Sequence, residues 1–222
     1  MTNNFELVKN FIQTQWEGKF DENTDAFYTI EIIGRKKDGA TIESHKFKTY
    51  FIKNMEDLDK YENEIKTICD ILKMRAYVSI NSKSFKQVTL NTLCTYAERV
   101  AQNNYNNPYS IFDSCTGKFV DRSNQLWIID VDKEEADEYG CNIDDIGSLY
   151  KNIIENKCEP NKKIVTIIPT KSGKHIICHP FNVEKFQYYL SDFCNSVGYD
   201  VPHKLETLIK KNNNTLLYEN IE

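Results

Sequence analysis

The chain has 222 residues, of which 40% are hydrophobic and 27% are charged, an ordinary balance for a globular protein. Its net charge of −5 argues against a protein that coats nucleic acid with a basic surface, although it leaves room for a local basic patch. The sequence holds no run of about 18 apolar residues, so no membrane span is predicted. Its seven cysteines lack zinc-clip spacing. Because their number is odd and the chain begins without a secretory signal, we expect reduced thiols in a cytoplasm.

Helical and strand patterns alternate through the first half of the chain. The Asp38-Gly39 pair suits a hairpin turn because both residues tolerate positive φ, and Asn54 can cap a helix. In order, the patterns predict a helix within 1–25, strands at 26–33 and 40–52, a helix at 55–73, a strand at 74–81, a helix at 84–102 and a loop at 103–123.

The second half continues the alternation, which predicts an α/β or α+β fold. We divide the chain into an N-terminal unit, 1–103, and a sheet unit, 104–222, that together form one compact module. The patterns predict strands at 125–132, 163–169, 175–179, 204–210 and 215–218, helices at 142–156 and 182–196, and an acidic loop at 133–138. Asn142 and Asn182 can cap the two helices.

The first candidate site is the Asp130-Val131-Asp132 end of an apolar strand. Residues two apart on a strand point the same way, so both carboxylates project from one face. Two such carboxylates repel each other unless a cation neutralises them, and oxygen ligands suit Mg²⁺ or Mn²⁺. The alternative is a polar strand end that leads into a solvated loop.

The second candidate site is the turn Thr170-Lys171-Ser172-Gly173-Lys174-His175 between two apolar strands. Its glycine allows close backbone approach, and its hydroxyl, amide and ammonium groups can bind phosphate oxygens. It is not a Walker loop, and the alternative is a basic hairpin turn exposed to solvent.

Four motifs in order give the chain a resemblance to the archaeo-eukaryotic primase superfamily, the primase–polymerases, closest to small phage and plasmid members. The resemblance covers about residues 74–219. The motifs are Arg75-Ala76-Tyr77 with Asn81, Trp127-Ile128-Ile129-Asp130-Val131-Asp132, Thr170-Lys171-Ser172-Gly173-Lys174-His175, and Lys211-Asn212-Asn213-Asn214-Thr215-Leu216-Leu217-Tyr218.

The resemblance implies a primase–polymerase catalytic core in which a sheet like an RNA-recognition module packs on an N-terminal α/β unit. It implies a two-metal nucleotidyltransferase that adds nucleoside triphosphates on a single-stranded DNA template in phage or mobile-element replication. The expected location is the cytoplasm of a bacterial cell or phage-infected host, and a replicative helicase is a candidate partner. Asp130 and Asp132 would bind Mg²⁺ or Mn²⁺. The nucleotide would be bound by Lys171, Ser172, Lys174 and His175, with Arg75 and Asn81 near nucleotide or template.

The chain departs from the family at the third acid, where Leu208 occupies the expected position. Glu206 stands two residues earlier, on the same predicted strand face, and would complete the catalytic and metal-binding set. Two other readings remain open. One is a relative that binds nucleotide or nucleic acid without turnover; the other is a metal-dependent nuclease.

Overall fold

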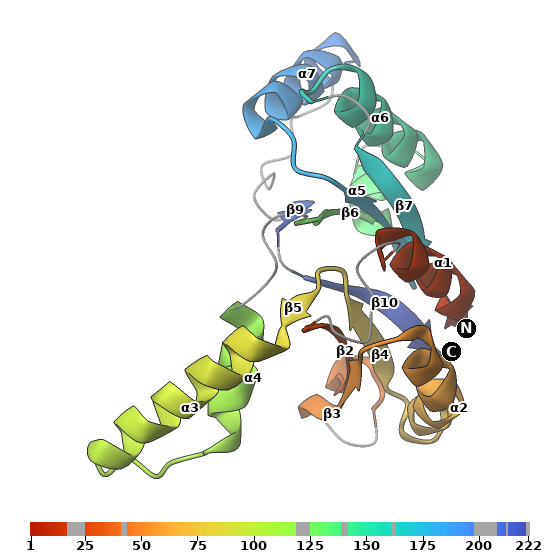
Figure 1. Ribbon diagram of the computed structural model, residues 1–222. Coiled ribbons are helices and arrows are strands. Elements are labelled where there is room, and N and C mark those ends of the chain that lie inside the picture. Colours follow the sequence, from red (N-terminus) through yellow and green to blue (C-terminus); the bar gives the residue numbers. More distant parts are fainter. Residues whose placement is uncertain are drawn as a thin grey trace.

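The computed structural model describes residues 1–16, 25–40, 44–118, 125–138, 142–160, 163–197, 208–211 and 213–220. It is a mixed α+β fold built on two antiparallel sheets, which agrees with the predicted class at the coarse level (Figure 1). Among the described helices, none is both long and apolar enough to cross a membrane.

The first sheet brings together both ends of the chain. Its strand order is β1-β10-β4-β2-β3, with β5 paired to β2. The strands are β1 (Thr2–Asn3), β2 (Ala26–Gly34), β3 (Ser44–Ile52), β4 (Arg75–Ser79), β5 (Lys83–Ser84) and β10 (Asn214–Glu219). Because β10 pairs with β4, the two sheets do not follow the predicted division between residues 103 and 104: the last strand of the chain belongs to the sheet of the first half.

The second sheet has the order β7-β8-β6-β9, and every described pairing in it is antiparallel. Its strands are β6 (Trp127–Asp132), β7 (Ile164–Pro169), β8 (Gly173–Cys178) and β9 (Ile209–Lys210). One face packs under α6 (Ile143–Asn156) and α7 (Val183–Val197), and the other faces the first sheet (Figure 1).

A hydrophobic core joins the two sheets. Helix α1 (Phe5–Trp16) lies where they meet, and Phe5, Val8 and Ile12 pack with residues of both. Helix α2 (Met55–Leu72) packs against the first sheet through Leu58, Ile65 and Cys69. This shared core holds the facing strands of the two sheets in a fixed relation.

Capping residues start several helices where the sequence places them. Asn54 accepts a hydrogen bond from Asp57 N (2.8 Å), and Asn142 accepts one from Asp144 N (3.0 Å). The predicted turn around Asp38 is a short 3₁₀ helix, Lys36–Asp38, that ends at Gly39 with φ of 74°. Glycine adopts that conformation without the steric cost that a Cβ atom adds.

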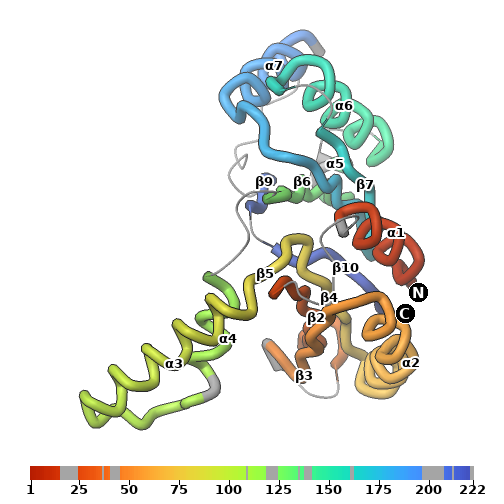
Figure 2. The backbone as a smooth tube through the Cα atoms, in the orientation of Figure 1, coloured from red at the N-terminus to blue at the C-terminus, as the bar shows by residue number. Residues whose placement is uncertain are grey.

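Two predicted loops are helical. Residues 103–123 contain α4 (Tyr109–Lys118), which forms an arm with α3 (Phe85–Ala101) that projects from the body (Figure 2). The acidic segment 133–138 is α5 (Lys133–Glu138), whose Ala136 is buried under α6. In both segments tertiary packing of a few apolar side chains outweighs a weak local pattern.

Candidate functional site

Strand pairing brings the two predicted motifs together. Strands β6 and β8 are neighbours, with Asp130 opposite His175 and Asp132 opposite Gly173. Side chains alternate along a strand, so Asp130, Asp132 and His175 share the face directed at the first sheet. The intervening Val131 points to the core under the helices. The acids and the basic turn therefore form one site.

Gly173 allows the turn to approach β6 closely. A Cβ atom built on Gly173 would lie 2.0 Å from the Val131 carbonyl oxygen, so no other residue fits without moving a strand. The turn is closed by Thr170 N donating to Gly173 O (2.9 Å) and joined to α5 by Lys133 N donating to Ser172 O (2.8 Å). The glycine thus fixes Lys171 and Ser172 beside the acids.

Asp130 lies in a network of charges that links the sheets. His175 Nε2 is 3.3 Å from Asp130 Oδ1, and Lys210 of β9 forms an ion pair with Asp130 Oδ2. The other ring nitrogen of His175 lies 2.9 Å from the hydroxyl of Thr215 in β10. Burial alone would raise the pKa of Asp130, but hydrogen bonds from His175 and Lys210 outweigh it and bring the pKa to about 2. Asp130 is therefore ionised and compensated.

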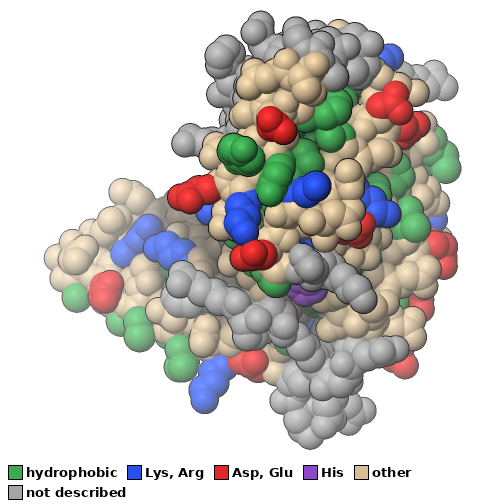
Figure 3. Space-filling model, turned by 90° about the horizontal axis from the view of Figure 1, so that it is seen from above, with side chains coloured by type: hydrophobic (Ala, Val, Ile, Leu, Met, Phe, Trp, Pro, Cys, Tyr) green, Lys and Arg blue, Asp and Glu red, His purple; other side chains and the backbone are tan. Residues whose placement is uncertain are grey.

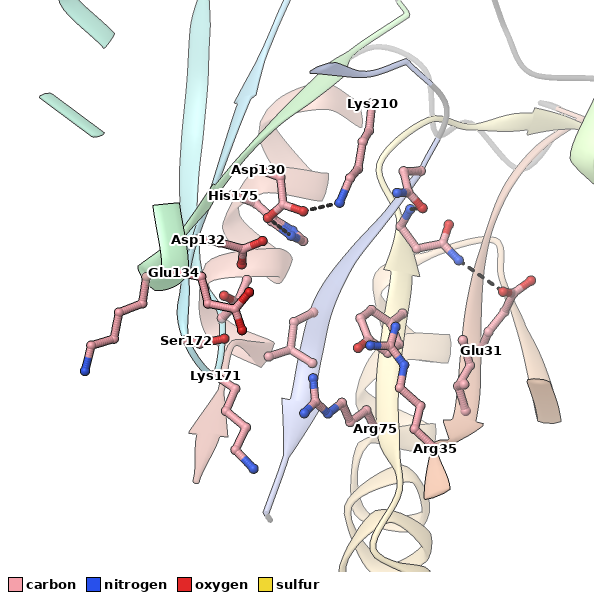
Figure 4. Close-up of a pocket in the computed structure, with 17 residues that line it drawn as sticks. Glu31, Arg35, Arg75, Asp130, Asp132, Glu134, Lys171, Ser172, His175 and Lys210 are labelled. Atoms are coloured by element: carbon pink, nitrogen blue, oxygen red, sulfur yellow. Dashed lines mark hydrogen bonds and ion pairs between the residues drawn. The ribbon is translucent and has the colours of Figure 1, made fainter. Parts of the chain in front are cut away.

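Asp132 has a different setting. Its side chain reaches solvent although part of it is buried, and it makes no hydrogen bond or ion pair with the described residues. Partial burial and the negative charge of Asp130 raise its pKa. Glu134, at the start of α5, follows on the same wall (Figure 4). The carboxylates of Asp132 and Glu134 are thus the ones available to a cation from solution.

The opposite wall comes from the first sheet and carries two arginines, Arg35 and Arg75, together with Glu31. Arg75 is anchored by Asp38 (2.7 Å) and by Glu219 (3.1 Å), and the Arg35 guanidinium lies 5.5 Å from the ring centre of Tyr77. Together the walls enclose a polar cleft with a volume of about 500 Å³. Figure 4 shows Asp130, Asp132 and Glu134 on one side and the two arginines, with Glu31, on the other.

Six of the residues predicted from the sequence line this cleft. They are Arg75, Asp130, Asp132, Lys171, Ser172 and His175. Figure 4 shows Lys171 and Ser172 at the turn below Asp132. Glu206 lies outside the described residues, and Leu208, at the expected place of the family's acid, is buried in the core under the helices.

Two predicted residues are placed elsewhere. Lys174 lies on the other face of β8, against Gly147 of α6, and pairs with Asp144 at 2.6 Å. Alternation along the strand requires this, because His175 takes the cleft face. Asn81 is buried and hydrogen-bonds to both backbone groups of Leu126, at 2.7 and 3.0 Å, so it fixes the start of β6.

The structure adds residues that the sequence analysis did not single out. The clearest are Lys210 and Thr215, which touch the Asp130–His175 pair. Both stand in segments already marked, the late strand and the Lys-Asn-Asn-Asn-Thr motif, but only strand pairing reveals their target. Arg35 and Glu134 were missed because each lies in a predicted polar turn or loop, where charged residues are common.

The donor set suits a divalent cation in part. Among the described residues, no group of three or more His, Cys, Asp or Glu side chains is arranged to hold a metal. Asp130, Asp132 and Glu134 nevertheless present carboxylate oxygens, the ligands of Mg²⁺ and Mn²⁺, on one wall. Lys210 forms an ion pair with Asp130, so a divalent cation would have to compete with the Lys210 ammonium group for that carboxylate.

Comparisons of the chain with protein-family models, curated proteins and solved structures gave no match. The function is therefore inferred from the residues and geometry of the cleft.

Proposed function

We propose that the cleft binds a nucleoside triphosphate and that the protein is a metal-dependent nucleotidyltransferase of the primase–polymerase type, acting on a single-stranded DNA template. One observation carries the proposal: the Asp130-Val131-Asp132 strand end and the Thr170–His175 turn, distant in sequence, line one polar cleft. A carboxylate wall facing cationic groups suits a metal-bound triphosphate.

The phosphate-binding side would consist of Lys171, Ser172 and Arg75. Lys171 and Ser172 are exposed at the tip of the turn, and Arg75 is held rigidly by Asp38 and Glu219. A guanidinium that is already oriented loses little freedom when it binds phosphate oxygens. Lys171 supplies a mobile charge, whereas Lys174 is committed to Asp144.

The metal-binding side would consist of Asp132, Glu134 and Asp130. Bound Mg²⁺ or Mn²⁺ would activate a 3′-hydroxyl group and stabilise the departing pyrophosphate. The residues themselves position the cation: Asp132 and Glu134 are open to solvent, and His175, bonded to Thr215, keeps Asp130 oriented. Lys210 also lines the cleft, so its ammonium group would be available to phosphate oxygens once a metal ion replaced it at Asp130.

The arrangement of the two sheets supports the proposal. The second sheet carries α6 and α7 on one face and presents its other face to the first sheet, with the cleft between. We take this sheet as the counterpart of the RNA-recognition-like unit, and the first sheet with α2 as the counterpart of the N-terminal unit.

The direct test is nucleotide incorporation on primed and unprimed single-stranded DNA, with ribo- or deoxyribonucleoside triphosphates and Mg²⁺ or Mn²⁺. We expect metal-dependent product that is lost in Asp132→Asn. Lys171→Met should weaken nucleotide binding about tenfold or more, as expected for a lost charged contact, while Lys174→Met should leave it unchanged. No product with either metal, or full activity of Asp132→Asn, would refute the enzyme.

One observation favours a second candidate, a protein that binds nucleotide without turnover. Lys210 neutralises Asp130, and the described residues provide no complete metal-binding group. This candidate predicts nucleotide binding that depends on Lys171 but no release of pyrophosphate. Pyrophosphate release that disappears in Asp132→Asn would exclude it, and an intact labelled oligonucleotide in the same reactions would exclude a nuclease.

A further inference from the structure

The arm formed by α3 and α4 uses only one face of α3 for packing. On that face Val88 is buried against Ile111 and Cys115 of α4 and against Phe27 of the first sheet. Tyr96 donates to the Pro108 carbonyl (2.7 Å) from the same side. The arm projects away from both sheets (Figures 1 and 2), so its outer face meets no other described element.

The outer face of α3 is an exposed apolar stripe. Leu90, Leu93 and Val100 are 52%, 60% and 58% exposed. Cys94, Ala97 and Ala101 are exposed beside them. The positions 90, 93, 97 and 100 follow the three–four spacing of a helix that pairs with another helix. Figure 3 shows hydrophobic side chains along the edge of the projecting arm.

We propose that this stripe pairs with the same stripe of a second copy, antiparallel, about a two-fold axis that crosses the stripe midway between Leu93 and Ala97. The side chains of the stripe are larger at its amino end (Leu90 and Leu93) than at its carboxyl end (Ala97 and Val100). In an antiparallel pair Leu90 therefore lies level with Val100 of the second copy, and Leu93 level with Ala97 of the second copy. Large residues then meet small ones in every layer, which gives even packing. A parallel pair would place leucine against leucine and alanine against alanine.

The charges of α3 agree with an antiparallel pair. Helix α3 carries three charged residues, Lys86, Glu98 and Arg99. Lys86 precedes Leu90 by one turn, so in the antiparallel pair it reaches the carboxyl end of the partner helix, where free carbonyl groups favour a cation. Arg99 faces away, donating to the Asn106 carbonyl (3.0 Å). The two copies of Lys86 lie at opposite ends, so like charges do not meet.

The size of the contact sets its strength. A 17-residue helix is about 25 Å long. A pair of such helices forms a smaller contact than a standard stable interface, which buries about 1,200–2,000 Å². The dimer is therefore concentration-dependent. Its contact lies on the arm, away from the residues that line the cleft, so it does not depend on the proposed activity.

Sedimentation velocity of the full chain from low to high micromolar concentration tests the dimer. We expect a monomer–dimer equilibrium that Leu93→Glu weakens about tenfold or more, because a charge would be buried at the contact. Ile71→Glu is the matched control, since Ile71 is 69% exposed on α2. It should leave the equilibrium unchanged, and circular dichroism of both variants should be native.

Thiol cross-linking tests the antiparallel register. Cys94 is free and exposed, and it lies close to the two-fold axis. A short bis-maleimide should therefore yield a covalent dimer of the wild type, lost in both Cys94→Ser and Leu93→Glu but retained in Ile71→Glu. A protein that is monomeric at every concentration, or a dimer that survives both Leu93→Glu and Ala97→Glu, would overturn the proposal.

Discussion

Asp130 and Asp132 stand two residues apart on one strand face but differ in electrostatic setting. Asp130 is compensated by His175 and Lys210, which lower its pKa, whereas burial and Asp130 itself raise the pKa of Asp132. A cation that enters the cleft is therefore expected to bind more favourably at Asp132, where no cationic side chain is paired with the carboxylate. At Asp130 it must compete with Lys210.

Replacing Lys210 tests that competition. In Lys210→Met the ammonium group is gone and Asp130 is free to bind a metal. We expect Mn²⁺ to bind about fivefold more tightly, which corresponds to about 1 kcal/mol for a partly exposed ion pair. Calorimetry or the paramagnetic resonance of Mn²⁺ would measure the change.

Lys174→Met serves as the control for the Lys210 variant, because Lys174 pairs with Asp144 outside the cleft. Its Mn²⁺ affinity should equal that of the wild type. Weaker Mn²⁺ binding by Lys210→Met would instead show that Lys210 supports the site rather than competing for it.

Lys83 of β5 is a buried lysine whose charge destabilises the folded protein at neutral pH. It is only 7% exposed, with its ammonium 3.2 Å from the Thr29 hydroxyl, and burial lowers its pKa from 10.5 to about 8. Below pH 8 both the folded and unfolded chains carry the proton, so folding must bury a charge. Between pH 8 and 10.5 only the unfolded chain binds the proton, so folding must release it. The free energy of that release falls as the pH rises, and the destabilisation caused by Lys83 falls with it.

Lys83→Met should therefore raise the free energy of unfolding by about 2 kcal/mol at pH 7. The gain over wild type should shrink between pH 8 and 10.5 and vanish above that range. Urea denaturation of both proteins across this range measures the difference. A gain that stays constant with pH would show that Lys83 is not the group responsible.

At the level of elements, the pairing of β6 with β8 depends on Gly173. A methyl group there would meet the Val131 carbonyl oxygen at 2.0 Å, so Gly173→Ala must push the strands apart. We expect the free energy of unfolding to fall by about 3 kcal/mol, as for an overpacked site. Nucleotide binding should weaken with it, because the turn moves.

Gly117→Ala is the matched control for the Gly173 variant. A Cβ atom at Gly117, in α4, would meet no atom within 4 Å. Alanine also favours a helix over glycine, so the free energy of unfolding should stay the same or rise by about 0.5–1 kcal/mol. Equal decreases in the free energy of unfolding for the two variants, measured by thermal or urea denaturation, would contradict the role given to Gly173.

Elements with strong local signals could be predicted from the sequence. Asn54 and Asn142 cap helices as expected, and the apolar run that ends at Asp130 and Asp132 is a buried strand. Helices α4 and α5 could not be predicted, because short polar segments become helical only when a few side chains, such as Ala136, find a core to pack against.

The site was predictable in composition but not in detail. The order of motifs placed Asp130, Asp132 and His175 together, whereas the separation of Lys171 from Lys174 could not be foreseen: Lys171 stays in the turn at the cleft, and Lys174 takes the face of β8 opposite to His175. That choice follows from the strand beginning at Gly173, one residue that local pattern cannot fix. Lys210 reaches Asp130 only because β9 pairs with β6, a contact distant in sequence.

At the level of the whole molecule, the two sheets form one folding unit. Strand β10 carries Thr215 from the first sheet to His175 in the second, and one continuous core contains residues of both sheets. Asn4 adds a polar clamp: its buried amide donates to the Pro169 carbonyl of β7 (2.8 Å) and to the Leu216 carbonyl of β10 (2.9 Å).

Asn4→Ala tests this coupling, because it leaves two carbonyl groups at the junction of the sheets without their donor. We expect the free energy of unfolding to fall by about 2 kcal/mol. In a Trp16→Phe background, fluorescence reports on Trp127 in the second sheet and far-ultraviolet circular dichroism on the whole chain. The two urea transitions should coincide and move together to lower urea, as in a single cooperative unit.

Asn91→Ala is the control for the Asn4 variant, since the Asn91 amide donates to the Gln87 carbonyl (2.8 Å) on an exposed helix surface where water can replace it. Its transition should stay close to that of the parent. If the fluorescence transition of Asn4→Ala separated from the circular dichroism transition, the sheets would be independent units held mainly by the clamp. The cleft between them would then open without global unfolding, and nucleotide binding would be lost at lower urea than the secondary structure.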